Sequence, residues 1–311
     1  MTYGDAEYQY ELVDDWAKLP PGWGFRDVAG IAIDKQDRVY VLNRSEHPII
    51  VLDRDGNFVQ AWGEGFFKRA HGSCMGADSS IYCTDDGKHI VAKFTLNGQL
   101  LKTLGTMGQA AETGYKQSFD LWDGLRRISH GAPPFNRPTG VSISPRGEIY
   151  VSDGYGNARI HKFDADGKLL MSWGEPGGEL GQFRLPHSVR VDKRGQVWVA
   201  DRENHRIQIF DTNGKFLKGF TDLLRPTDLF IDKEDTVYVS ELSNRVSIFT
   251  IDGKLVARWG NTAVTKEEAL FLSPHAIAVD SHSDIYVGQV AMSTMKIDRG
   301  PRTIQKFSRI E

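Results

Sequence analysis

Short runs in which apolar and polar residues alternate recur along the chain, and compact turns separate them. A run such as HSVRVD or HAIAVD is followed by a turn and then by a second run such as VWVAD or IYVGQ. A loop leads to a third run such as RIQIFD, and an Asp-Gly or Asn-Gly turn leads to a fourth such as LLMSWG or LVARWG. Alternation with a period of two, interrupted by such turns, is typical of antiparallel hairpins.

A unit of four strands that repeats every 40 to 50 residues or so indicates the blades of a β-propeller. Six units begin near Val28, Ala70, Arg137, Leu185, Arg225 and Ser273. The last unit has no fourth strand of its own, whereas the segment YQYELVDDW near the N-terminus resembles the fourth strands. We therefore predict an all-β fold, a single six-bladed β-propeller over residues 1–311. An N-terminal strand is expected to pair with the last blade and close the ring.

The segment 106–136 breaks the period between the second and third units. It joins a fourth strand to the next first strand, so it should emerge on the face where first strands begin. Long loops in compact domains are usually functional or disordered. We interpret the segment as a lid or rim insertion, and the alternative is a passive surface insertion.

Histidines occupy the same position at the start of alternate units. In chain order this slot holds Ala29, His71, Thr139, His187, Thr227 and His275. In a ring of six blades, every second slot lies about 120° from the next, so the three imidazoles would converge on the axis. Three imidazoles form the ligand set of an open zinc site, with the fourth position left for water or substrate.

Loops between second and third strands open on the same face as these slots. They place Arg44, Tyr155, Arg202 and Glu203 at the same end of the channel as the histidines. Taken singly, the arginines could be ion-pair partners in the channel wall and the tyrosine could simply pack in its loop. The aspartates that end second strands are expected to brace loops rather than do chemistry; they are Asp85, Asp153 and Asp201.

Composition excludes some classes of function. Of the 311 residues, 40% are hydrophobic and 25% are charged, which is typical of a soluble globular protein. The net charge of −3 argues against a broad nucleic-acid surface, which needs a basic face. The first residues lack a signal-peptide pattern, and no apolar run approaches membrane length. We expect a cytoplasmic protein that binds neither membrane nor nucleic acid; its oligomeric state stays open.

The repeated unit resembles the NHL repeat, most clearly in VADRENHRIQIFDTNGKFLKGF. Further motifs resemble the peptidyl-α-hydroxyglycine α-amidating lyases, also called peptidylamidoglycolate lyases. They are VSDGYGNARI, LPHSVRVD, WVADRENHRIQIF and the pairs His71-Gly72 and Pro274-His275. The resemblance implies a six-bladed propeller that cleaves an N-acyl-α-hydroxyglycine into an amide and glyoxylate.

Matched motif to motif, the resemblance implies zinc ligands at His71, His187 and His275. It also implies that Tyr155 and Arg44 act at the reacting hydroxyl and that Arg202 lines the substrate site. The chemistry agrees with these residue types. Zinc polarises an oxygen, a tyrosine near positive charge can serve as a base, and arginine suits a planar carboxylate.

Three departures from the lyase pattern change the expectation. The aspartate that follows the last zinc histidine in the family is Ala276 here, so the implied calcium site keeps only the backbone carbonyls of Ile31 and Ser73. A methionine of the pocket wall is replaced by Ser273. The family's disulfides are missing, because the chain has only two cysteines. We expect a small-molecule or short peptidyl carbinolamide as substrate rather than neuropeptides.

Two other classes of protein remain open. A lactonase-like metallohydrolase can be built on the same scaffold, but it usually relies on calcium held by acidic and amide side chains, whereas His and Thr slots favour zinc. A non-enzymatic NHL module would bind a partner on its top face and would give the alternating histidines no role.

Overall fold

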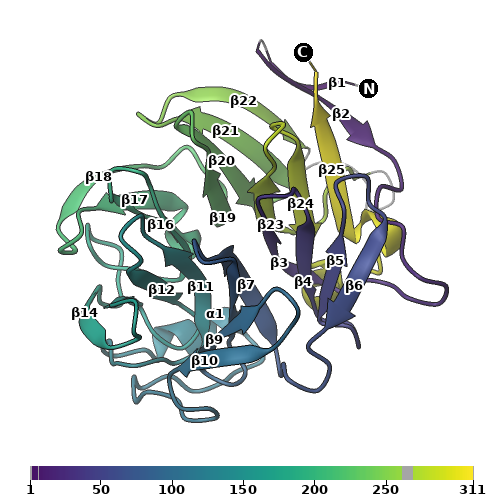
Figure 1. Cartoon of the computed structure of the whole chain (residues 1–311). Helices are drawn as coiled ribbons and strands as arrows, with labels where there is room; N and C mark the ends of the chain where they lie inside the picture. The colour runs from purple at the N-terminus through teal and green to yellow at the C-terminus, as the bar shows by residue number, and fades with distance from the viewer. Residues whose placement is uncertain (1, 6, 261–268, 311) are drawn as a thin grey trace. The chain divides into compact units, whose positions relative to one another are not determined.

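The computed structural model describes residues 2–5, 7–260 and 269–310. Within these residues the strands form six antiparallel sheets, five of four strands and one of five. This arrangement is the predicted all-β, six-bladed β-propeller, and in the five four-stranded sheets the strands follow one another in chain order (Figure 1). Contacts divide the chain into two compact units, Gly65–Pro226 and the combination of Met1–Glu64 with Thr227–Glu311.

The unit Gly65–Pro226 contains three blades. Their strands are β7 (Ala70–Met75), β8 (Ser80–Asp85), β9 (Ile90–Thr95) and β10 (Leu100–Leu104); β11 (Pro138–Ile143), β12 (Ile149–Asp153), β13 (Arg159–Phe163) and β14 (Leu169–Trp173); and β15 (Pro186–Val191), β16 (Val197–Asp201), β17 (Arg206–Phe210) and β18 (Phe216–Phe220). A 3-10 turn, η1 (Arg202–Asn204), follows β16, and helix α1 (Leu121–Arg126) lies in the insertion.

The other unit holds the remaining blades. Their strands are β3 (Val28–Ile33), β4 (Val39–Asn43), β5 (Ile49–Leu52) and β6 (Phe58–Trp62); β19 (Pro226–Ile231), β20 (Thr236–Glu241), β21 (Arg245–Thr250) and β22 (Leu255–Gly260); and β23 (Pro274–Val279), β24 (Ile285–Gln289) and β25 (Ile304–Arg309) with β1 (Thr2–Asp5) and β2 (Tyr8–Val13). The short helix α2 (Ala291–Met295) and the turn η2 (Gly300–Thr303) connect β24 to β25.

Burial explains the two kinds of strand pattern. Second strands such as β12 are buried at every residue, because both of their faces pack against neighbouring blades of the same unit. Fourth strands are less buried: no residue of β14 is fully buried, and partly buried and exposed residues alternate along β18. The turn before β14 has the expected chemistry: Gly167 has φ +84°, a conformation that favours glycine, and its amide donates to the Asp164 carbonyl at 3.0 Å.

The predicted pairing of the N-terminal strand with the last blade is confirmed. Strand β2 pairs with β25 in antiparallel register, with Leu12 opposite Phe307. Strand β1, which the sequence analysis did not identify, folds back on β2 and makes this sheet five-stranded. Tyr10 of β2 is fully buried, stacks on Trp259 with ring centroids 5.4 Å apart and accepts a hydrogen bond from Arg309 Nη1 at 2.9 Å.

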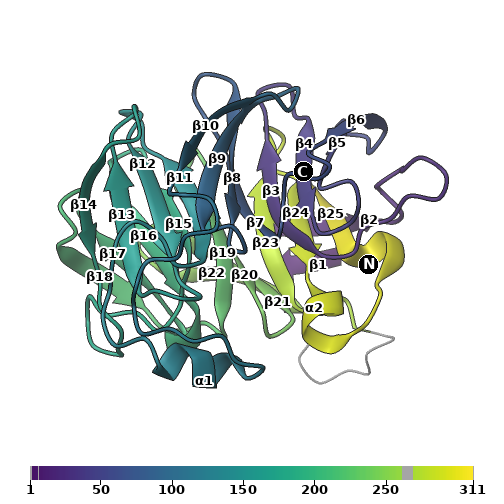
Figure 2. The ribbon, with the colours of Figure 1, turned by 90° about the horizontal axis from the view of Figure 1, so that it is seen from below.

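The insertion contains a capped helical turn. The Asp120 side chain caps α1 by accepting hydrogen bonds from the amides of Trp122 and Asp123. Figure 2 shows α1 beyond the ends of the strands of its unit rather than against the face of a sheet. Across the described residues, the helices are too short or too polar to cross a bilayer.

The buried Tyr10 provides a test of the N-terminal strand. We expect Tyr10→Ala to lower the free energy of unfolding by about 3 kcal/mol, because it removes a buried aromatic ring from the last blade. Urea denaturation measures the change, and Gln9→Ala, an exposed neighbour on the same strand, should be nearly neutral. Equal effects of the two substitutions would contradict a structural role for β2.

Candidate metal centre and active site

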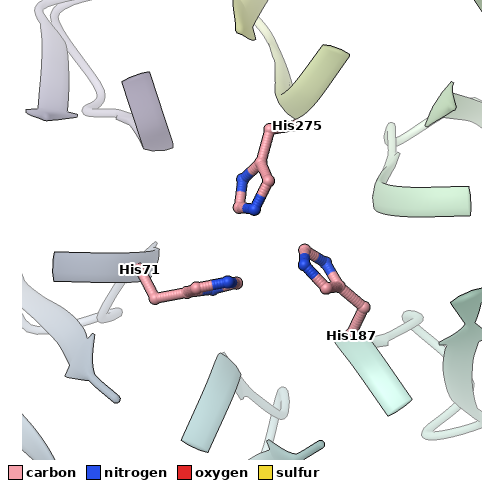
Figure 3. Close-up of side chains that lie close together, drawn as sticks. All are labelled: His71, His187 and His275. Carbon is pink, nitrogen blue, oxygen red and sulfur yellow. The ribbon is translucent and has the colours of Figure 1, made fainter. Parts of the chain in front are cut away.

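The histidines of the alternate slots come together. His71 lies on β7, His187 on β15 and His275 on β23, and all three are buried. One ligand atom from each lies within 4.8 Å of the others, and Figure 3 shows the imidazoles turned toward one another. The group can therefore hold a metal ion.

Hydrogen bonds on the far side of two rings fix which nitrogen is available. His71 Nδ1 donates to the Thr139 carbonyl at 2.6 Å, and His275 Nδ1 donates to the Ala29 carbonyl at 2.9 Å. A carbonyl oxygen only accepts, so in the neutral rings Nδ1 carries the proton and Nε2 keeps its lone pair. Metal-ligating histidines are typically oriented in this way, and the residues present fit a zinc ion.

The threonines of the slots make the same type of link. Thr139 Oγ1 donates to the Pro186 carbonyl at 2.7 Å, and Thr227 Oγ1 donates to the Pro274 carbonyl at 3.0 Å. Histidine and threonine thus both tie a first strand to the first strand of the next blade. Histidine keeps a second ring nitrogen that could bind a metal ion, whereas threonine has none, so the candidate ligands lie in alternate slots.

Tyr155 lies in the loop between β12 and β13, with 8% of its surface exposed. Its hydroxyl oxygen is 3.4 Å from His71 Nε2 and 3.4 Å from His187 Nε2. It also accepts a hydrogen bond from Arg202 Nη1 at 3.3 Å. The predicted tyrosine and one predicted arginine are therefore adjacent to two of the slot histidines.

Three guanidinium groups surround the Tyr155 ring. Their Cζ atoms lie 5.0 Å (Arg69), 5.3 Å (Arg137) and 5.5 Å (Arg202) from the ring centroid. The sequence analysis missed Arg69 and Arg137 as site residues. The available signal was their position, because each stands two residues before a slot, at His71 and Thr139. Positive charge at this distance favours the phenolate form of a tyrosine.

Two buried carboxylates hold these arginines. Asp86, fully buried, accepts from Arg69 Nη1 and, at 3.4 Å, from Arg137 Nη2. Glu203 accepts from Arg202 Nε at 2.7 Å and from Arg225 Nη2 at 2.7 Å. Four cations around two carboxylates leave net positive charge beside Tyr155.

The pKa shifts of Arg202 and Glu203 are consistent with an ionised pair. Burial opposes the charge of Arg202, but the neighbouring Tyr155 and Glu203 still raise its pKa above the ordinary value. Burial likewise opposes ionisation of Glu203. The neighbouring guanidinium groups of Arg202 and Arg225 outweigh this effect and hold the pKa of Glu203 below its usual range. Both groups of the Arg202–Glu203 pair therefore stay charged at neutral pH.

Arg44 lies just after β4, in the unit that contains β3 and β23. Its Nη1 donates to Ser293 Oγ at 3.1 Å and lies 3.5 Å from Asp27 Oδ2, and its side chain is 11% exposed. The catalytic role of Arg44 stays a prediction.

The two residues of the implied calcium site are placed on first strands. Ile31 lies on β3 and Ser73 on β7, and both are buried. Ala276 on β23 is also buried and brings no side-chain oxygen. Calcium binding through the carbonyls of Ile31 and Ser73 stays a prediction.

The aspartates at the ends of second strands brace loops, as predicted. Asp85 accepts from the amides of Lys68 at 2.6 Å and Arg69 at 3.0 Å. Asp201 accepts from the Arg184 amide at 3.0 Å and Asp153 from the Asn136 amide at 2.7 Å. These bonds fix the segments that enter each first strand, including the one that carries Arg69.

The insertion packs beside Tyr155. Its Leu125 and Ile128 form a buried cluster with Tyr155 and Leu185. Thr113 Oγ1 donates to the Gly156 carbonyl at 2.5 Å, one residue beyond the tyrosine. Tyr115 Oη accepts from Arg137 Nη1 at 2.8 Å, so the insertion also contacts one of the three guanidinium groups. The segment contributes to the surroundings of the candidate base.

Comparison with known proteins agrees with the repeat pattern. The NHL repeat model matches residues 135–163 and 183–210. NHL repeat-containing protein 3 of Homo sapiens is 27% identical over 326 residues, which cover 99% of this chain and 86% of that protein. Peptidyl-alpha-hydroxyglycine alpha-amidating lyase 1 of Drosophila melanogaster is 30% identical over 196 residues, which cover 60% of this chain and 33% of that protein.

A solved structure of streptogramin B lyase has the same fold. It superposes with a TM-score of 0.61 at 16% identity and covers 97% of this chain and 88% of its own. At this identity the likeness concerns the fold alone. The described residues thus form a six-bladed β-propeller, and two of its blades contain the stretches that match the NHL repeat model.

Proposed function

We propose that the protein is a metal-dependent lyase that cleaves an N-acyl-α-hydroxyglycine-like carbinolamide into an amide and glyoxylate. One observation carries the proposal: the Tyr155 hydroxyl lies 3.4 Å from both His71 Nε2 and His187 Nε2, among three guanidinium groups. A tyrosine in these surroundings is suited to take a proton from a hydroxyl bound beside the imidazoles. The similarity to the Drosophila lyase supports the same chemistry.

The reaction needs one proton to move from oxygen to nitrogen. Tyr155, as the phenolate, takes the proton of the carbinol hydroxyl. The oxygen electrons form the carbonyl of glyoxylate as the C–N bond breaks, and that bond's electrons go to the amide nitrogen. Tyr155 then returns the proton to this nitrogen, which gives the neutral amide and restores the phenolate. Arg69, Arg137 and Arg202 stabilise the phenolate at the start and end of the cycle.

His71, His187 and His275 would hold the zinc ion, which supplies Lewis acidity to a substrate oxygen when bound. The substrate carboxylate would pair with guanidinium groups, for which we propose Arg44 and Arg202. Because Arg202 Nε is engaged by Glu203, its Nη atoms are the ones that face the reacting groups. The proposed substrate is a small molecule or a short peptide, and neither nucleic acid nor membrane is a proposed partner.

A non-enzymatic NHL binding module is the second candidate. The relative that matches 99% of this chain has a name that states no activity. A binding module needs no metal, so metal content separates the two functions.

Metal content tests the proposed function directly. We expect about one zinc or similar transition metal per purified chain, because three buried imidazoles form a complete ligand set for an open site. His187→Ala should lose the metal, whereas His130→Ala, an exposed histidine of the insertion, should keep it. Elemental analysis by mass spectrometry measures both. Metal-free protein after incubation with zinc would exclude the lyase and favour the binding module.

Removal of the Tyr155 hydroxyl tests the role proposed for this residue. We expect Tyr155→Phe to lower turnover of α-hydroxyhippurate by about 10³-fold, since positioned acid–base groups contribute 10²–10⁴-fold. Glyoxylate release measures the rate. Metal content and thermal unfolding should stay unchanged. Arg44→Ala should also remove most of the activity.

The matched control is Tyr115→Phe. This hydroxyl contacts Arg137 but lies on the insertion, so we expect less than about a tenfold loss. Full activity of Tyr155→Phe would overturn the assigned role, even if the metal is present.

A further inference from the structure

A cavity of about 310 Å³ lies beside the insertion, within the unit Gly65–Pro226. This volume is within the range of small-molecule sites. Its lining residues come from the insertion, from the loop before β13 and from the loop before β15: Trp122, Leu125, Arg126, Ile128, Ala158, Pro176, Gly177, Phe183 and Arg184. It contains none of the histidines or other residues assigned to the lyase site.

Apolar side chains form most of the cavity wall. Leu125 and Ile128 of the insertion are buried by Tyr155 and Leu185 on their other side, so the wall is anchored to the propeller. Phe183 is fully buried and Ala158 nearly so. Trp122 adds an aromatic ring that is only partly buried. An apolar ligand group could therefore enter without moving the buried core residues.

Two exposed arginines complete the lining. Within the described residues, Arg126 and Arg184 have exposed side chains that make no hydrogen bond or ion pair. Neighbouring arginines differ: Arg127 pairs with Asp123 at 2.9 Å, and Arg159 pairs with Glu175. The lining contains no acidic residue. The cavity thus combines an apolar wall with two exposed guanidinium groups, and Asp123, whose charge interacts with Arg126, lies outside the lining.

We infer that this cavity is a binding site for an amphipathic carboxylate, a ligand with an apolar chain or ring and one anionic end. The apolar part would lie against Trp122, Ile128 and Phe183. The carboxylate would pair with the guanidinium groups of Arg126 and Arg184, whose planar donors match its geometry. The site does not depend on the proposed lyase activity.

Octanoate and octan-1-ol test the inference, because they share the chain and differ in charge. Isothermal titration calorimetry of the full protein should detect octanoate at one site per chain, with octan-1-ol binding more weakly. Arg126→Gln with Arg184→Gln should weaken octanoate by about tenfold and leave octan-1-ol unchanged. Trp122→Ala should weaken both, since it removes part of the apolar wall.

Matched controls are available on the same segment. Arg127→Gln removes a paired arginine outside the lining, and Phe119→Ala removes a fully exposed aromatic ring, so neither should change octanoate binding. His187→Ala should also bind octanoate normally, which separates this site from a metal-bound carboxylate. Absence of octanoate binding to the wild-type protein, or equal affinity in the double arginine variant, would overturn the inference. So would loss of binding in His187→Ala.

Discussion

Hydrogen bonds from the slot side chains to the next blade help determine where the candidate site can form. At four slots, His71, Thr139, Thr227 and His275, a histidine Nδ1 or a threonine Oγ1 donates to a carbonyl on the first strand of the next blade. These carbonyls are buried, and a buried carbonyl without a donor destabilises the fold. Packing therefore favours a donor at these slots, and histidine supplies one while keeping its second nitrogen for a ligand.

The charge around Tyr155 follows from a second constraint, the cost of withdrawing arginine from water: Arg202 is buried, and the other three guanidinium groups are partly buried. Arg69 and Arg137 share one carboxylate, Asp86, and Arg202 and Arg225 share another, Glu203. A buried guanidinium needs an anionic partner, but one carboxylate for each pair leaves an excess of positive charge. That excess faces the tyrosine and favours anionic groups in its neighbourhood. Structural pairing and the proposed chemistry thus draw on the same residues.

Much of this arrangement could be predicted from sequence because the repeat converts position in the chain into position in a blade. The strand pattern located the blades, the slots located the histidines, and the second-to-third-strand loops located Tyr155 and Arg202. Arg69 and Arg137 were not predicted, because they stand two residues before their slots, outside the slot and loop positions that the repeat singles out. Strand β1 was not predicted, because its four residues, TYGD, are too few to show an alternation of apolar and polar positions. The cavity could not be predicted, since its shape depends on how α1 packs, and the insertion has no counterpart in other blades.

The insertion also separates two properties that enzymes often combine in one loop. The imidazoles and most of the guanidinium groups belong to the repeats, whereas one side of the cavity wall and the Tyr115 contact to Arg137 belong to the segment 106–136. Changes within that segment can alter what is bound next to Tyr155 without disturbing the blades, because both ends of the segment join strands that the repeat already fixes. In such a propeller, one surface segment could change the shape of a neighbouring cavity, while the three imidazoles stay fixed by the repeats.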